Sequence, residues 1–248
     1  VMGGGDVGGA KTHIMNMVTG LAERNEVMLL SFRAGPFADE ARERGIDVRV
    51  IERHNPFRAA RAMRDLVDEF RPDIIHCHGG RANLMGAMVR RSRRVPIVTT
   101  VHSDYRLDYL GNPFKQHTFG AANAVALRFL DFYQPVADRM ARTLIERGFD
   151  PERIVKIYNG MDFVRPTGDF DRASYLRDTF GTEIGEGDVL CGIAARLTAV
   201  KDIATTVRAF AEALKDAPQL RLFIAGEGED EEMLRKLCIQ LGVAARVT

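Results

Sequence analysis

The chain has 248 residues, of which 46% are apolar, which is enough to bury one large core or two smaller ones. Its formal net charge of +1 argues against a nucleic-acid partner, and its apolar runs fall far short of the roughly 20 residues of a membrane helix. No secretory signal is visible, and Cys77, Cys191 and Cys238 are predicted to be reduced core residues, so we expect a cytoplasmic protein.

Strands and helices are predicted to alternate over the first two thirds of the chain. The predicted strands cover residues 26–32, 46–51, 74–77, 95–101 and 154–158. The predicted helices cover residues 10–24, 37–44, 56–70, 82–91, 113–130 and 137–147. This alternation is typical of a parallel sheet with helices on both faces. The aromatic residues of and after the long helix are expected to lie in the core: Phe114, Phe119, Phe129, Phe132 and Tyr133.

A stretch rich in Gly, Pro and polar residues between 159 and 171 is predicted to be a linker. It divides the chain into a first domain, 1–162, and a second domain, 163–248. In the second domain we expect strands over 189–195 and 220–225, each followed by a helix. Both domains are therefore predicted to be doubly wound α/β units of the Rossmann-like type, the second incomplete because both chain ends read as interrupted strands.

The glycines near the start allow two interpretations. Gly3, Gly5 and Gly8 satisfy G-x-G-x-x-G, and the next strand ends in Arg33, which an NADP-dependent oxidoreductase could use. The other interpretation is that Gly8 and Gly9, which lack a Cβ atom, let the backbone approach a phosphate or a sugar. Lys11 and His13 follow in the first helical turn and could face this site or water.

Three histidines come at or near the ends of predicted strands. His76 and His78 alternate on one strand and so share a face, but the sequence offers no third ligand nearby, so a metal site is not favoured. His78 is expected at the ligand-binding end of its strand, with His76 structural. His102 follows the strand at 95–101, at the rim where parallel sheets bind ligands, or else it caps a loop.

Two clusters of cations are candidate anion sites. Arg90, Arg91, Arg93 and Arg94 end a helix, where they could contact phospholipid headgroups or an anionic acceptor, or simply be solvated. The range 196–201 carries Arg196 and Lys201 between a buried strand and the N-terminus of a helix. Because backbone N–H groups and the helix dipole favour anions there, we interpret the pair as a diphosphate clamp; the alternative is two surface charges on a turn.

Six short segments occur in a fixed order along nearly the whole chain. They are Gly8-Gly9-Ala10-Lys11-Thr12-His13, Ile75-His76-Cys77-His78-Gly79, Thr99-Thr100-Val101-His102, Ile157-Tyr158-Asn159-Gly160-Met161-Asp162, Arg196 to Lys201, and Leu222-Phe223-Ile224-Ala225-Gly226-Glu227-Gly228. In this order they resemble the motifs of the retaining glycosyltransferases of sequence family 4. That family has the GT-B fold, in which two Rossmann-like domains face a cleft.

The resemblance implies transfer of a sugar from a UDP- or GDP-linked donor, with retention and without metal or cofactor, in glycan biosynthesis. It implies catalytic roles for His102, Arg196 and Lys201. The implied substrate-binding residues are Gly8, Gly9, His78, Asn159, Gly226, Glu227 and Gly228. The acceptor would be a lipid-linked sugar, a polysaccharide or a small molecule. A non-catalytic binding relative is the remaining alternative.

The family completes its donor site with two glutamates eight positions apart. No two glutamates of this chain have that spacing. We therefore expect the chain to be a fragment of a longer enzyme, and to be inactive or nearly so by itself.

Overall fold

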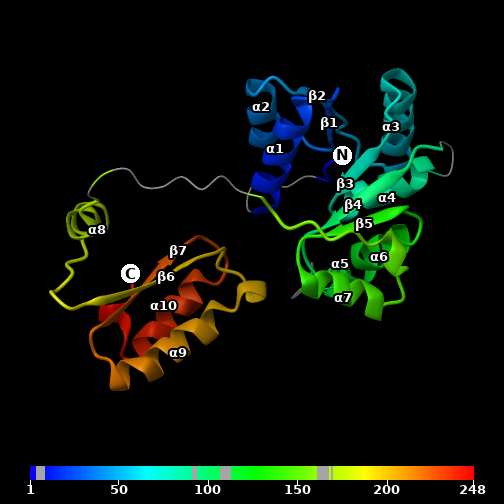
Figure 1. The fold of residues 1–248 in the computed structure, drawn as a ribbon. Helices are drawn as coiled ribbons and strands as arrows, with labels where there is room; N and C mark the ends of the chain where they lie inside the picture. Colours follow the sequence, from blue (N-terminus) through cyan, green and yellow to red (C-terminus); the bar gives the residue numbers. More distant parts are fainter. Residues whose placement is uncertain (4–8, 91–93, 107–112, 161–167, 169) are drawn as a thin grey trace. The chain divides into compact units, whose positions relative to one another are not determined.

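The computed structural model describes residues 1–3, 9–90, 94–106, 113–160, 168 and 170–248. Its contacts divide the chain into two compact units, Val1–Asp162 and Phe163–Thr248, and each is described by itself (Figure 1). No helix among these residues is both long and apolar enough to span a bilayer.

The first unit is built on parallel strands. They are β1 (Met28–Ser31), β2 (Asp47–Val50), β3 (Ile75–His78), β4 (Ile97–Val101) and β5 (Phe132–Pro135). β1 pairs with β2, and β3, β4 and β5 pair in that order. Met2 bridges the two groups, since it pairs with Ser31 of β1 and with His78 of β3. The carboxyl ends of β1, β3 and β4 consequently lie along one edge.

Helices cover both faces of this sheet (Figure 1). They are α1 (Gly9–Ala22), α2 (Pro36–Glu43), α3 (Pro56–Phe70), α4 (Gly80–Arg90), α5 (Pro113–Lys115), α6 (Ala121–Leu127) and α7 (Asp138–Glu146). Side chains alternate between the faces of a strand. Leu29 packs with α1 and α2 and Leu30 packs with α3, and both are 2% exposed. The sheet is therefore covered on both sides, as predicted from the sequence.

Alternation along β3 decides where its histidines point. Cys77 faces α4, where a Cβ atom added to Gly86 would lie 2.9 Å from the Cys77 Sγ atom. This glycine therefore lets α4 approach the strand closely. His76 and His78, one position before and after Cys77, point to the opposite face, which α1 covers.

The second unit is smaller. It contains α8 (Arg172–Phe180), β6 (Val189–Ala194), α9 (Ile203–Asp216), β7 (Leu220–Ala225) and α10 (Glu231–Gln240). The strands are parallel, and Val247 forms a further parallel bridge to Leu222. α9 and α10 share a core in which Val207, Phe210 and Leu234 are buried. Two βα units in succession thus hold the loops at 195–202 and 226–230 next to each other.

The prediction of an aromatic core in the long helix is wrong. Phe114, Phe119 and Phe129 are 74%, 58% and 61% exposed, Phe132 is 45% exposed, and only Tyr133 is buried. A π-helical turn, Gln116–Gly120, interrupts the helix and changes its periodicity. Phe129 instead lines an apolar surface groove of about 790 Å³ between α4 and α6.

Buried polar contacts decide which face of α6 turns inward. Asn123 is 5% exposed and accepts a 2.9 Å hydrogen bond from the Asn83 Nδ2 atom of α4. Thr99 of β4 donates a 2.6 Å hydrogen bond to the Asn83 Oδ1 atom. Because this chain of amides and hydroxyls must stay paired when buried, small and polar residues face α4 and the phenylalanines face outward.

The strand predicted over 154–158 is also wrong. Only Ile154 forms a bridge, to Tyr133 of β5. Val155 and Ile157 donate hydrogen bonds to β5 carbonyls, but the segment forms no regular ladder with it. It leads directly to Asn159.

Candidate functional site

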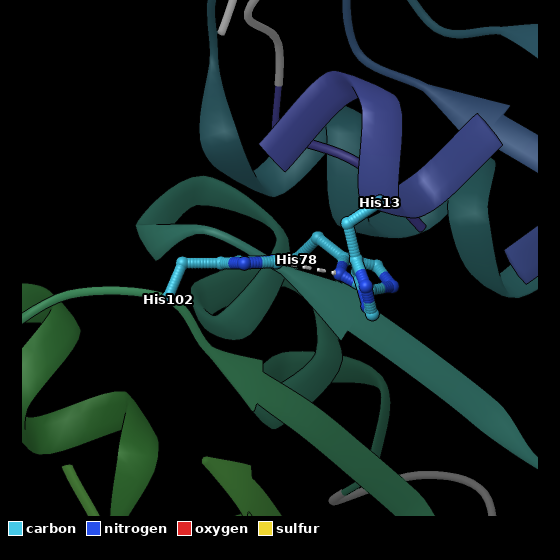
Figure 2. Close-up of side chains that lie close together, drawn as sticks. All are labelled: His13, His78 and His102. Carbon is cyan, nitrogen blue, oxygen red and sulfur yellow. Dashed lines mark hydrogen bonds between the residues drawn. The ribbon is translucent and has the colours of Figure 1, made fainter. Parts of the chain in front are cut away.

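Three histidines from distant parts of the first unit lie together (Figure 2). His13 comes from the first turns of α1, His78 is the last residue of β3, and His102 follows the last residue of β4. β3 and β4 pair in register, with His78 opposite Thr100, so the chain after each strand leaves the sheet at the same edge. The parallel sheet and the helix above it therefore create the cluster.

The three rings are close enough to share a ligand. One nitrogen from each residue lies within 4.8 Å of the others. His78 Nδ1 and His102 Nε2 are 3.3 Å apart, and His13 meets His102 edge to face with ring centroids 5.2 Å apart. His76 stacks on His78 at 4.4 Å and holds its own Nε2 atom 2.7 Å from the Thr100 Oγ1 atom. The structural role predicted for His76 agrees with this contact.

Burial keeps the cluster neutral. His78 is 4% exposed and His13 is 9% exposed. Removal from water disfavours a charged imidazolium. It lowers the pKa of His102 to about 4 and that of His76 to about 3, and it also lowers the pKa of His13 and of His78. Near pH 7 these rings can accept or donate a hydrogen bond, or ligate a metal, without first losing a proton.

The cluster corrects one argument from the sequence. A metal site was not favoured because no third ligand stood near His76 and His78, yet α1 supplies His13. His13 precedes His78 by 65 residues in the chain, so local spacing could not reveal the contact. The one signal in the sequence is the position of His13, early in a predicted helix that follows a run of glycines.

Other candidates in the first unit lie in varied surroundings. Gly9 begins α1, whereas Gly8 lies outside the described residues. Lys11 forms an ion pair with Glu40 of α2 at 2.7 Å, so its charge is already paired within the first unit. Asn159 is exposed.

The arginine cluster at the end of α4 is partly engaged in the fold. Arg90 forms a two-pronged ion pair with Asp131, with its Nε atom 2.9 Å from both carboxylate oxygens. Arg94 is exposed, and Arg91 and Arg93 lie outside the described residues.

In the second unit, main-chain bonds fix the loop that carries Arg196. The residues on either side of it donate hydrogen bonds to the end of β7 and to the loop that follows: Ala195 N–H to the Ala225 carbonyl at 3.0 Å, and Leu197 N–H to the Glu227 carbonyl at 2.9 Å. Leu197 is 5% exposed, whereas Arg196 and Lys201 are exposed. Among the described residues no acid pairs with either cation.

Gly226 and Gly228 make this arrangement possible. A Cβ atom on Gly226 would lie 1.8 Å from the Ala195 carbonyl oxygen, and one on Gly228 would lie 2.1 Å from the Leu197 carbonyl oxygen. Both distances are far inside van der Waals contact, so these positions require glycine. The two glycines predicted to bind substrate thus also have a structural role, because they let the Arg196 loop pack closely against them.

A side chain of the protein already caps the helix N-terminus after Lys201, which the sequence predicted to be free to bind an anion. Asp202 adopts a left-handed conformation, φ 47°, and caps α9. Its carboxylate accepts hydrogen bonds from Thr205 N–H at 3.4 Å and from the Thr205 hydroxyl at 2.8 Å. A carboxylate already occupies part of this helix end, so the two cations are the stronger anion-recognising groups here.

Comparisons with known proteins agree over both units. Residues 7–165 match the family model Glycosyltransferase Family 4, and residues 177–248 match Glycosyl transferases group 1. An uncharacterized glycosyltransferase of Methanocaldococcus jannaschii is 28% identical over 73% of this chain and 46% of its own length. The alpha-monoglucosyldiacylglycerol synthase of Acholeplasma laidlawii is 27% identical over 73% of this chain and 47% of its own length. The chain thus matches about half the length of these relatives.

Solved structures give the same fold. HepE of Anabaena in complex with UDP-glucose superposes with a TM-score of 0.78 at 21% identity, over all of this chain and 66% of that one. A glycosyltransferase of Rickettsia africae superposes with a TM-score of 0.73 at 15% identity, over all of this chain and 65% of that one. The predicted GT-B fold is confirmed, and the reductase alternative is set aside. Because the family model Glycosyltransferase Family 4 matches more than half of this chain, the chain belongs to that family.

Proposed function

We propose that this chain is part of an enzyme that transfers a sugar from a nucleoside diphosphate sugar to an acceptor. The observation that carries the proposal is the Arg196 loop. Its main chain is fixed on both sides of Arg196, and its two cations are exposed with no acid partner among the described residues. Such a site suits a ligand with concentrated negative charge.

The chemistry follows from where charge develops. Breaking the bond between the anomeric carbon and the donor oxygen leaves negative charge on the departing diphosphate. Arg196 and Lys201 would stabilise that charge as it forms, and a group already held in place does so without reorganisation. Gly226, Glu227 and Gly228 would approach the nucleotide through their main chain, with the glycines also seating the loop.

In the first unit, His102 would hold the donor sugar. It is half-buried, and its lowered pKa keeps it neutral, so one ring nitrogen can donate to or accept from a sugar hydroxyl. His78 would orient it through the 3.3 Å contact between their ring nitrogens. Gly8, Gly9 and Asn159 complete the proposed substrate-binding set. We further propose that transfer retains the anomeric configuration and needs neither metal nor cofactor, as the family resemblance implies.

The donor class is the better supported half of the reaction. HepE of Anabaena, which shares this fold, has been solved with UDP and with UDP-glucose. UDP-linked sugars are therefore the donors to test first, followed by the GDP-linked sugars that the family resemblance also implies. For the acceptor, a lipid-linked sugar, a polysaccharide and a small molecule remain the proposed classes. We propose a cytoplasmic site of action, with the arginine cluster as the place for any contact with phospholipid headgroups.

The test is a donor screen with the full-length gene product, measuring release of UDP or GDP and the anomeric configuration of the product. One donor should support turnover, and Arg196→Ala and Lys201→Ala should remove most of it. Arg208→Ala, which removes an exposed cation of α9, is the matched control and should leave turnover unchanged. A protein that neither hydrolyses nor transfers from any of these donors would be a non-catalytic relative, contrary to the proposal.

A further inference from the structure

We propose that His13, His78 and His102 form a binding site for one first-row transition-metal ion of the Zn²⁺ type. The site differs in chemistry from the proposed sugar transfer, which needs no metal, although it shares His78 and His102 with it. The proposal rests on the geometry of three side chains, on the unsatisfied Nε2 atom of His13 and on the ligand types that the cluster offers.

The geometry is close to that of a three-histidine site. Zn²⁺ binds imidazole nitrogen at about 2.0–2.1 Å in tetrahedral geometry, which places two ligand nitrogens about 3.3 Å apart. His78 Nδ1 and His102 Nε2 already have that separation, 3.3 Å. The third nitrogen, from His13, completes a group in which all separations are within 4.8 Å. Figure 2 shows the three side chains gathered between α1 and the ends of β3 and β4.

The unsatisfied atoms point to a missing ligand. His13 Nε2 and His78 Nε2 are buried and have no hydrogen-bond partner among the described residues. Both side chains are at least nine-tenths buried, at 9% and 4% exposed. A buried polar atom without a partner costs about 1–3 kcal/mol. Because His78 would bind through Nδ1, the ion would use the Nε2 atom of His13 and remove the cost of leaving that atom unpaired.

The ligand set selects the class of ion. The cluster offers imidazoles, and no carboxylate belongs to it among the described residues. Imidazole suits Zn²⁺, Cu²⁺, Ni²⁺ and Co²⁺, whereas Mg²⁺, Ca²⁺ and Mn²⁺ prefer oxygen ligands. His76 supports the arrangement from behind, since it stacks on His78 while Thr100 holds its ring. Three protein ligands leave a fourth position open to water.

The test is titration of the chain with Co²⁺, followed by its visible absorption bands, and with Zn²⁺ in competition with a chromophoric chelator. We expect one equivalent of each ion to bind. His13→Gln and His102→Gln should each weaken binding by about tenfold or more, since each removes one of three ligands. His54→Gln removes an exposed histidine outside the cluster and should bind as the unsubstituted chain does.

Circular dichroism of each variant separates lost ligation from lost folding, and a variant that does not fold is replaced by the asparagine substitution at the same position. Absence of stoichiometric binding, or equal binding by the His102→Gln and His54→Gln proteins, would overturn the proposal. The result is independent of the donor screen, because binding is read without turnover. A chain that binds Co²⁺ but no nucleotide sugar would support this site and contradict the proposed function.

Discussion

The histidine cluster of the first unit and the Arg196 loop of the second unit are opposite kinds of site. The cluster is neutral and largely buried, and two of its nitrogen atoms have no hydrogen-bond partner in the described part of the chain. The loop is exposed and cationic, and main-chain bonds hold it in place. Burial makes the histidines sensitive to what fills the space between them, whereas exposure leaves the cations available to a diphosphate. The two sites should therefore fail in different ways when they are altered.

The largest expected effect is on the charged loop. In the full-length gene product, Arg196→Ala combined with Lys201→Ala should lower kcat/KM by at least about 10²–10³, the range found when a group that stabilises developing negative charge is removed. Steady-state kinetics with the donor found in the screen measures this. For Arg208→Ala, kcat/KM should stay within about twofold of that of the unsubstituted protein. An equal loss in this control would show that the Arg196 loop has no specific role.

The next effect separates the loop's shape from its charge. Gly226→Ala should destabilise the second unit by about 1–3 kcal/mol or more, because the new methyl group would meet the Ala195 carbonyl oxygen at 1.8 Å. Thermal or urea unfolding measures it. Gly192→Ala is the matched control, since a Cβ atom there meets nothing within 4 Å. Equal unfolding midpoints for the two variants would contradict the close approach.

A smaller loss is expected at the neutral cluster. His102→Ala should lower kcat/KM by about 10–10², because it removes one hydrogen bond to the proposed sugar and leaves the diphosphate contacts in place. His54→Ala, which replaces an exposed histidine elsewhere in the same unit, should leave kcat/KM unchanged. If both substitutions lower the rate alike, the cluster has no specific role in transfer.

The smallest effect is on stability against acid. In the unfolded chain histidines take up protons below a pH of about 6.5. In the folded chain burial holds the pKa of His76 at about 3 and that of His102 at about 4. Between the pKa of the unfolded chain and the lower pKa values of the folded chain, the unfolded state binds more protons than the folded state. The free energy of unfolding should therefore fall as the pH falls from about 6.5 towards 4.

Thermal unfolding of the metal-free chain between pH 7.5 and pH 5 measures this slope. His76→Gln should flatten it, because that histidine no longer contributes, whereas His54→Gln should leave it unchanged. A slope that is the same in both variants would show that other groups cause the acid sensitivity.

The same contrast explains what could be predicted from the sequence. In the Arg196 loop the strand, the two cations and the helix follow one another closely in the sequence. Pattern and spacing were therefore enough to predict where the loop lies. Most strands and helices were predictable for the same reason, since their signals are also local. The histidine cluster depends on α1 packing over β3, and Asp202 occupies the helix end through a left-handed backbone that no spacing rule specifies. The exposed phenylalanines were misplaced because a π-helical turn and the Asn83–Asn123 contact override helical periodicity.

The central claim is that Arg196 and Lys201 recognise the diphosphate of the donor. Isothermal titration of this chain with UDP and with uridine tests it most directly, because the two ligands differ only in the diphosphate. We predict that the chain binds UDP, that Arg196→Ala with Lys201→Ala weakens this binding at least tenfold, and that uridine binding is unchanged. Equal affinity of the unsubstituted and doubly substituted chains for UDP would contradict the claim.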